Sequence, residues 1–347
     1  MLWFKHVTLV WFQLLVLLQI LVLVLLLLAK GLFMLEDNWQ GPIGENDGIE
    51  KTLAHWQSIA RRYGDVRSNW RLELFLYKAF IDAYVKRKYS VEMACEAQAY
   101  EVLAQAGETG VRSAVDAASA ALARVEKEFA PRQQLKEELK SWGLSKYSEL
   151  DQILDNMYCA LNDRQWLEAE FEKILAMQDN AAQLAGIDRI LNWENPGPGG
   201  FYDNLGVEGR QPHLVRQKRW EDDPGYVHSP IEFNHHRPAS TYRQSWMTCA
   251  FTRYDTLLLM RYEGLDGKAQ YRVRATYSGP FRPVMRLVAD GKYEIHGPVG
   301  QPKPIRPLEF KVPREATADG VLQLRWELVN AVRGCQVAEV WLMKEKN

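Results

Sequence analysis

The spacing of apolar residues changes once along this chain, and that change constrains the fold more than any other feature of the sequence. Up to about residue 193, apolar side chains recur at helical spacing, as in the run Leu72, Phe75, Leu76, Ala79 and Phe80. From about residue 246 they alternate with polar ones, as in Tyr271, Val273 and Ala275. A period of about 3.6 residues indicates one face of a helix, and a period of about two indicates a strand that is buried on one side. The sequence therefore predicts a multi-domain α+β chain, in which an all-α helical array is followed by an antiparallel β-sandwich.

The helical array is predicted over residues 49–193. One helix is expected to begin at Ser68 and a second at Ser90, because serine is a favoured N-cap residue. An alanine-rich helix follows over about 109–129, and a further helix begins at Asp163. Four polar side chains of the array could form a polar pocket, namely those of Tyr77, Asp82, Tyr84 and Glu96. They are interpreted instead as solvated surface groups and core aromatic side chains.

The sandwich is predicted over residues 246–347. Its strand-like runs are separated by turns that contain glycine or proline, and they lie at 246–251, 256–262, 271–277, 284–289, 292–296, 322–328 and 337–342. Short strands between such turns are typical of an antiparallel sandwich, and about 100 residues are enough to form a core.

A loop-rich hinge is predicted between the two, over residues 194–245. No period lasts in this segment, yet it is rich in aromatic, arginine and histidine side chains, which are uncommon in flexible linkers. A sugar ring stacks on an aromatic side chain while polar groups bind its hydroxyls, so this mixture favours carbohydrate recognition. The predicted ligand-binding residues are Trp193, Tyr202, Asp203, Asn204, His213, Arg216 and Trp220. The alternative interpretation is that these aromatic side chains only attach the loop to the sandwich.

Catalytic chemistry has weaker support in the sequence. Motifs of the common nucleophilic, phosphate-binding and zinc-dependent enzymes are absent, and the spacing of two catalytic carboxylates cannot be read from sequence. Asp203 and His213 are the candidate catalytic residues. His235 and His236 are adjacent and would point to opposite sides of an extended segment, so neither a metal site nor a cofactor is predicted.

The first residues of the chain are predicted to span a membrane. Residues 7–29 carry no charge, and as a helix they are long enough to cross a hydrocarbon core of about 30 Å. The sequence therefore predicts a transmembrane signal-anchor over 1–34, a linker over 35–48 and an extracytoplasmic remainder. The alternative is a cleaved signal peptide, because Ala29 and Gly31 have the small side chains of a processing site. The protein would then be secreted.

Charge and cysteine content bear on the possible partners and disulfides of the chain. With 43 Lys and Arg against 44 Asp and Glu, the chain lacks the positive excess that a general nucleic-acid binder needs, so no nucleic-acid partner is expected. Outside the cytosol, one disulfide could form in each domain, and the sequence leaves the pairing open among Cys95, Cys159, Cys249 and Cys335.

Several stretches of the chain resemble a known group of proteins. The segments ILNWENPGPGGFYDNLG, QPHLVR and RGCQVAEVWLMK are similar to the C-terminal region of large, uncharacterised secreted bacterial proteins of glycoside-hydrolase type, associated with polysaccharide breakdown. The last segment also resembles the final strand of galactose-binding-like (jelly-roll) modules. The helical stretch NWRLELFLYKAFIDAYVKRKYSVEMACEA looks like the helical layer that follows the catalytic barrel in some glycoside hydrolases. An apolar segment stands where that barrel is expected.

The resemblance therefore implies an accessory protein, membrane-anchored or secreted, that binds carbohydrate at the hinge and sandwich without cleaving it. Two alternatives remain open. One is a glycoside hydrolase or lyase fragment acting on polysaccharide, and the other is a structural or interaction protein that binds a partner through the helix face of Leu72 and Phe80.

Overall fold

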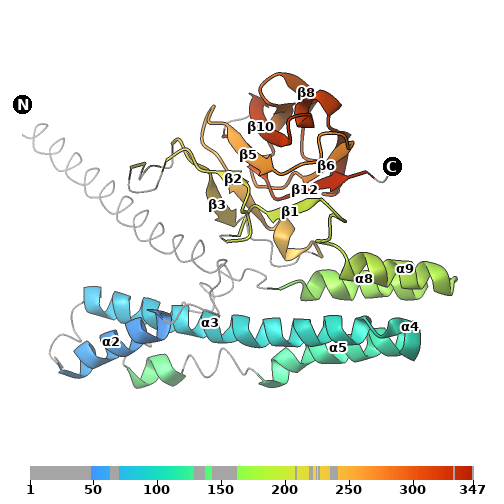
Figure 1. The fold of residues 1–347 in the computed structure, drawn as a ribbon. Helices are drawn as coiled ribbons and strands as arrows, with labels where there is room; N and C mark the ends of the chain where they lie inside the picture. Colours follow the sequence, from blue (N-terminus) through green and yellow to red (C-terminus); the bar gives the residue numbers. More distant parts are fainter. Residues whose placement is uncertain are drawn as a thin grey trace, which may run out of the picture.

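The computed structural model describes residues 48–62, 70–128, 137–142, 162–207, 209–218, 222–223, 225, 227–234, 241–330 and 333–345. Within these ranges the chain combines a layer of helices with antiparallel sheets, and the helices lie along one side of the sheets (Figure 1). The predicted anchor at 1–34, with its membrane segment 7–29, and all but the last residue of the linker lie outside the described residues. No helix among those described is long and apolar enough to cross a membrane.

The helical layer is built around one long helix. Helix α3 spans Trp70–Leu103, and it packs against α2 (Gly48–Arg62) near its start and against α5 (Val111–Glu128) near its end. The short helix α4 (Ala106–Thr109) connects α3 to α5, while α8 (Arg164–Ala176) and α9 (Asn180–Leu191) lie between this layer and the sheets (Figure 1). Alanines bring α3 and α5 close together, since Ala99, Ala114, Ala118 and Ala121 are all buried between them.

The predicted helix boundary at Ser90 is wrong. Ser90 lies inside α3, and its hydroxyl donates to the carbonyl oxygen of Lys86, one turn earlier, at 3.0 Å. A serine that bonds back to its own helix does not have to interrupt it. The helix is continuous because it serves two apolar clusters, one around Phe80 with α2 and one around Leu103 with α5 and α8.

The strands form two main sheets and a small third one. The four-stranded sheet has the order β1 (Phe201–Asn204), β12 (Glu339–Lys344), β6 (Tyr271–Thr276), β9 (Pro307–Lys311). The five-stranded sheet has the order β2 (Leu214–Val215), β5 (Leu258–Glu263), β10 (Val321–Asn330), β7 (Val284–Ala289), β8 (Tyr293–Val299). The three-stranded sheet has the order β11 (Gln336–Val337), β4 (Thr248–Phe251), β3 (Ile231–Asn234).

The two main sheets share one apolar core, which makes this part a β-sandwich. Val273 and Leu342 contribute from the four-stranded sheet, and Met260 and Trp326 contribute from the five-stranded sheet, all of them fully buried. Burying each such side chain stabilises the fold by about 1.5–3 kcal/mol. The period of two in the sequence therefore correctly predicted strands that bury one face in the core of the sandwich.

The hinge segment contains strands that the sequence analysis did not predict. Tyr202 of β1 pairs with Trp341 of β12, and Leu214 of β2 pairs with Met260 of β5, so both segments extend the edges of the sandwich. A strand of two to four residues is too short to show a period, which is why it reads as a loop. Cys249 and Cys335 are buried and free, Cys95 is buried, and Cys159 lies outside the described residues.

Candidate functional site

A buried carboxylate lies where the helices meet the sandwich. Glu339, the first residue of β12, is fully buried. Its carboxylate accepts hydrogen bonds from Trp193 Nε1 at 3.2 Å, Tyr202 hydroxyl at 2.9 Å, Trp246 Nε1 at 2.6 Å and Thr276 hydroxyl at 3.2 Å. These donors replace the water that the carboxylate loses on burial. Glu339 thereby joins the end of the helical layer to the sandwich.

A buried arginine completes this junction. The guanidinium of Arg243 lies 4.4 Å from the ring centre of Trp166 and 5.0 Å from that of Trp193. It forms an ion pair with Asp163 at 2.9 Å and lies 4.0 Å from Glu339. Burial opposes its charge, but the carboxylates of Asp163 and Glu339 outweigh burial and raise the pKa of Arg243 above its ordinary value. The paired charges and the two indole faces hold α8 against the sandwich.

The junction also contains a buried carboxyl group whose pKa is raised. Glu96 of α3 accepts a hydrogen bond from the backbone N–H of Asp163 at 2.7 Å. Burial, together with the nearby charge of Asp163, raises the pKa of Glu96 to about 8. The contact between α3 and the start of α8 therefore depends on pH in the neutral range.

Two of the predicted ligand-binding residues belong to this junction. The ring of Trp193 packs against Trp166, Trp246 and Trp341, with ring centres 5.6, 5.7 and 6.0 Å apart. The polar atoms of Trp193 and Tyr202 already donate to Glu339. A sugar bound by these two side chains would have to compete with that carboxylate.

The two candidate catalytic residues are in contact with each other. Asp203 of β1 is fully buried, and its carboxylate oxygens lie 3.0 Å from His213 Nδ1. The hydroxyl of Tyr262 also donates to Asp203 at 3.1 Å, and the rings of Tyr262 and His213 stack with centres 4.5 Å apart. Burial and the charge of Asp203 raise the pKa of Tyr262 well above its ordinary value, so its hydroxyl stays a donor. The imidazole is held in one orientation, and its side chain is 21% exposed.

The remaining predicted residues do not form a common cluster with this pair. Asn204 is buried, and Arg216 bonds to Gln211 at 3.0 Å and forms an ion pair with Glu232. Arg216 therefore links two parts of the hinge segment, one at Gln211 and the other at Glu232. Trp220 lies outside the described residues, as do His235 and His236. Across the ranges that the structure describes, no group of three or more His, Cys, Asp or Glu side chains could hold a metal ion.

Sequence reasoning missed a solvent-facing aromatic surface on the sandwich. Tyr254, in the loop after β4, is 64% exposed and has a backbone φ of 57°. Phe281, between β6 and β7, is 37% exposed, and the guanidinium of Arg333 lies 5.0 Å from its ring centre. We call Tyr254, Phe281 and Arg333 the loop face. A tyrosine in the left-handed region is strained, and such strain is often retained at functional sites.

Hydrogen bonds bring the loops of this face together. The backbone N–H of Thr252 donates to the carbonyl of Cys335 at 3.0 Å, which joins the Tyr254 loop to the Arg333 loop. The backbone N–H of Phe281 donates to the side-chain oxygen of Gln336 at 3.1 Å. Neither the exposure of these rings nor the φ of Tyr254 leaves a signal in the sequence, because both are set by loop conformation.

Comparison with known proteins gives weak similarities to carbohydrate-active proteins. No protein-family model matches the sequence, and no curated protein matches it. Among solved structures, a β-glucuronidase of Bacteroides uniformis is 10% identical with a TM-score of 0.28, covering 42% of this chain and 18% of that chain. The CBM35 module of Abf62 from Cellvibrio japonicus is 11% identical with a TM-score of 0.28, covering 42% of this chain and 94% of the module.

A longer alignment involves a second enzyme. A family GH115 4-O-methyl-α-glucuronidase with specificity for decorated arabinogalactans is 11% identical with a TM-score of 0.25, covering 87% of this chain and 34% of that chain. These neighbours are glycoside hydrolases and a carbohydrate-binding module. TM-scores this low assign no fold family to the chain, and the chain spans only 18% and 34% of the two enzymes.

Proposed function

We propose that this protein binds carbohydrate through the loop face of its sandwich and does not cleave it. In this proposal the sandwich is a galactose-binding-like, jelly-roll module. The protein acts as an accessory component outside the cytosol, either anchored in a membrane through residues 7–29 or secreted.

The observation that carries the proposal is two exposed rings on loops that hydrogen bonds connect, one of them beside a guanidinium. Tyr254 and Phe281 present apolar surface to solvent, while Arg333 supplies hydrogen-bond donors next to Phe281. The C–H face of a sugar stacks on such rings, and an arginine fork donates to its hydroxyls. The absence of cleavage is argued from Asp203, because a carboxylate buried beneath His213 and Tyr262 is out of reach of a glycosidic bond.

A glycan array and affinity electrophoresis with the full chain in mild detergent test this proposal. We expect Tyr254→Ala and Phe281→Ala each to weaken polysaccharide binding about ten-fold, the effect of losing one stacked ring. Phe75→Ala is the matched control, because Phe75 is 47% exposed but lies on α3, away from the sandwich. Binding to no polysaccharide class, or unchanged binding by both loop-face variants, would overturn the proposal.

The hinge remains a second proposed location for the sugar. Trp193→Ala and Tyr202→Ala would be assayed in the same way, with thermal unfolding as a companion measurement because both side chains also hold Glu339. Trp220→Ala completes the set. Loss of binding in Trp220→Ala, with Tyr254→Ala unaffected, would move the site from the loop face to the hinge.

A second function is favoured by the contact between Asp203 and His213. A buried carboxylate that orients an imidazole is the arrangement in which histidine acts as a general acid or base, and this supports a polysaccharide hydrolase or lyase. In that case His213→Ala should abolish activity, and Asp203→Asn should reduce it by disturbing the orientation of the ring. Activity that survives both substitutions together would refute these roles.

The third function, partner binding by the helical layer, needs a different surface from the one first expected. Leu72 and Phe80 are buried, so they are not accessible to a partner. Phe75, which stacks on Trp56 with ring centres 5.0 Å apart, is an exposed aromatic side chain of the same helix. A protein partner that is lost in Phe75→Ala, together with absence of sugar binding, would favour this function.

A further inference from the structure

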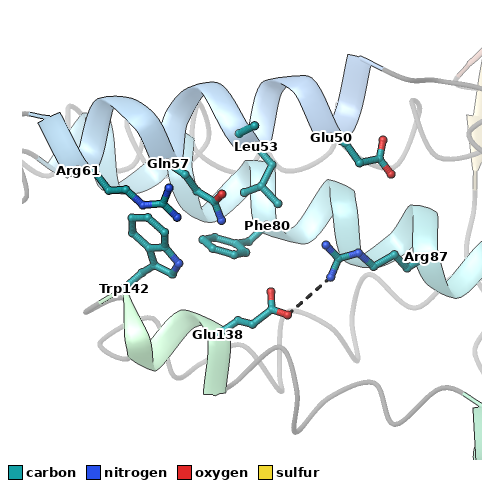
Figure 2. Close-up of a pocket in the computed structure, with 9 residues that line it drawn as sticks. Glu50, Leu53, Gln57, Arg61, Phe80, Arg87, Glu138 and Trp142 are labelled. Atoms are coloured by element: carbon teal, nitrogen blue, oxygen red, sulfur yellow. Dashed lines mark ion pairs between the residues drawn. The ribbon is translucent and has the colours of Figure 1, made fainter.

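A cavity of about 390 Å³ opens in the helical layer, far along the chain from the loop face. It lies between α2, α3 and the segment 137–142 (Figure 2). Leu53 and Phe80 are buried at its base, and Trp142 forms a wall, with the rings of Phe80 and Trp142 centred 6.1 Å apart. Known small-molecule sites have volumes of about 300–1,000 Å³. The apolar wall of this cavity is bordered by charged side chains from all three segments.

Two polar groups of the cavity come from one face of α2. Gln57 and Arg61 are four residues apart, so they lie on the same side of the helix. Figure 2 shows Arg61 extending toward Trp142 and Gln57 extending toward Phe80. The guanidinium of Arg61 lies 5.2 Å from the ring centre of Trp142. Contact with the indole limits the orientations of the guanidinium before any ligand binds.

Among the described residues, Arg61 is a cation of the cavity wall with no carboxylate within ion-pair distance. Glu50 forms an ion pair with Lys86 at 2.7 Å, and Glu138 lies 3.6 Å from Arg87. Among its described lining residues the cavity therefore offers one positive charge that no carboxylate pairs with, and its two carboxylates disfavour a dianion such as phosphate.

We propose that this cavity binds a small monoanionic carboxylate carried on a six-membered ring. The carboxylate pairs with the guanidinium fork of Arg61 and accepts a hydrogen bond from the amide of Gln57. The ring contacts Trp142 and Phe80. A sugar acid and an aromatic acid share this chemistry, and the experiment distinguishes them. The inference does not rest on carbohydrate binding by the sandwich, because it uses no residue of the loop face.

Isothermal titration calorimetry on the full chain in mild detergent tests the inference, with glucuronate and benzoate as probes and glucose as the uncharged control. We expect one of the two acids to bind with a Kd on the order of 1 mM, and glucose not to bind at this site. Arg61→Gln should weaken that binding about ten-fold or more, and Arg61→Lys should weaken it less, because lysine keeps the charge but loses the fork. Arg62→Gln is the matched control, since Arg62 lies next along α2 but does not line the cavity.

Binding of glucuronate that depends on Arg61 supports the proposal with a sugar acid as ligand, and binding of benzoate that depends on Arg61 supports it with an aromatic acid. If neither acid binds, or if Arg61→Gln and Arg62→Gln bind equally well, the proposal is overturned. Tyr254→Ala should leave binding of the acid unchanged, so failure of the loop-face proposal and failure of this one give different results. Thermal unfolding of each variant confirms that the helical layer is folded.

Discussion

Replacing Glu96 with glutamine should stabilise this protein and reduce its sensitivity to pH. The carboxyl group of Glu96 is buried beside Asp163 and accepts the backbone N–H of that residue. Ionisation places a second negative charge next to Asp163 in a site with little water, so the folded state favours the protonated form. Glutamine is neutral at every pH, and its amide oxygen accepts the same hydrogen bond.

The magnitude follows from the change in pKa on folding. The pKa of Glu96 rises from 4.5 to about 8, so the folded state holds the proton more tightly than the unfolded state does. The stability from this site is therefore complete below pH 4.5 and is lost as the pH rises to about 8, above which no more is lost. Within this window the free energy of unfolding falls by about 1.4 kcal/mol per pH unit. At pH 7 the loss amounts to about 3 kcal/mol, which Glu96→Gln should recover.

Urea unfolding followed by circular dichroism at pH values from 5 to 9 measures this difference. We expect the free energy of unfolding of the parent chain to fall relative to that of Glu96→Gln up to about pH 8, and the two curves to run parallel above it. Glu101→Gln is the matched control, because it removes an exposed carboxylate from the same helix. Parallel curves for the parent and Glu96→Gln between pH 5 and 8 would refute the reasoning.

Three further substitutions test the packing described above, each by urea unfolding. Glu339→Ala should lower the free energy of unfolding by about 3–5 kcal/mol, since it leaves buried donors without an acceptor, and a loss below about 1 kcal/mol would contradict its role. Ser90→Ala should change stability by less than about 0.5 kcal/mol, whereas the loss of an N-cap would cost about 1 kcal/mol. Gly206→Ala should lower the free energy of unfolding by about 1–3 kcal/mol, because the new methyl group would overlap Thr248. Gly107→Ala should not lower it in this way, because the space around Gly107 is open.

Local sequence patterns were sufficient for the elements that are long and buried on one side. The strand expected over 284–289 is observed as β7 at the same bounds, and the one expected over 271–277 is β6 with one residue fewer. The alanine-rich helix expected over 109–129 is α5. In each case the apolar period repeats often enough along the element to indicate both its type and its buried face.

The candidate site could be predicted only as a set of residue types. Asp203 and His213 were singled out from composition, but their contact depends on β1 and β2, which are too short for a pattern to predict. Trp193 and Tyr202 were assigned to a ligand on their chemistry alone, and the structure gives their polar atoms a partner inside the chain. The tertiary structure decides which aromatic side chains are exposed to solvent, and a local sequence pattern does not predict this.

The sequence by itself determined that the first part of the chain is helical, that its last hundred residues are stranded and which faces of the longer elements are apolar, because these depend on residues within a few positions of one another. Only the tertiary structure decided the junction around Glu339, whose partner Trp193 lies 146 residues away along the chain. It also decided that Glu96, which has the sequence context of a surface residue, is buried beside Asp163. The stability of a buried charged group depends on which distant groups replace the water it loses, and these groups come together only when the whole chain has folded.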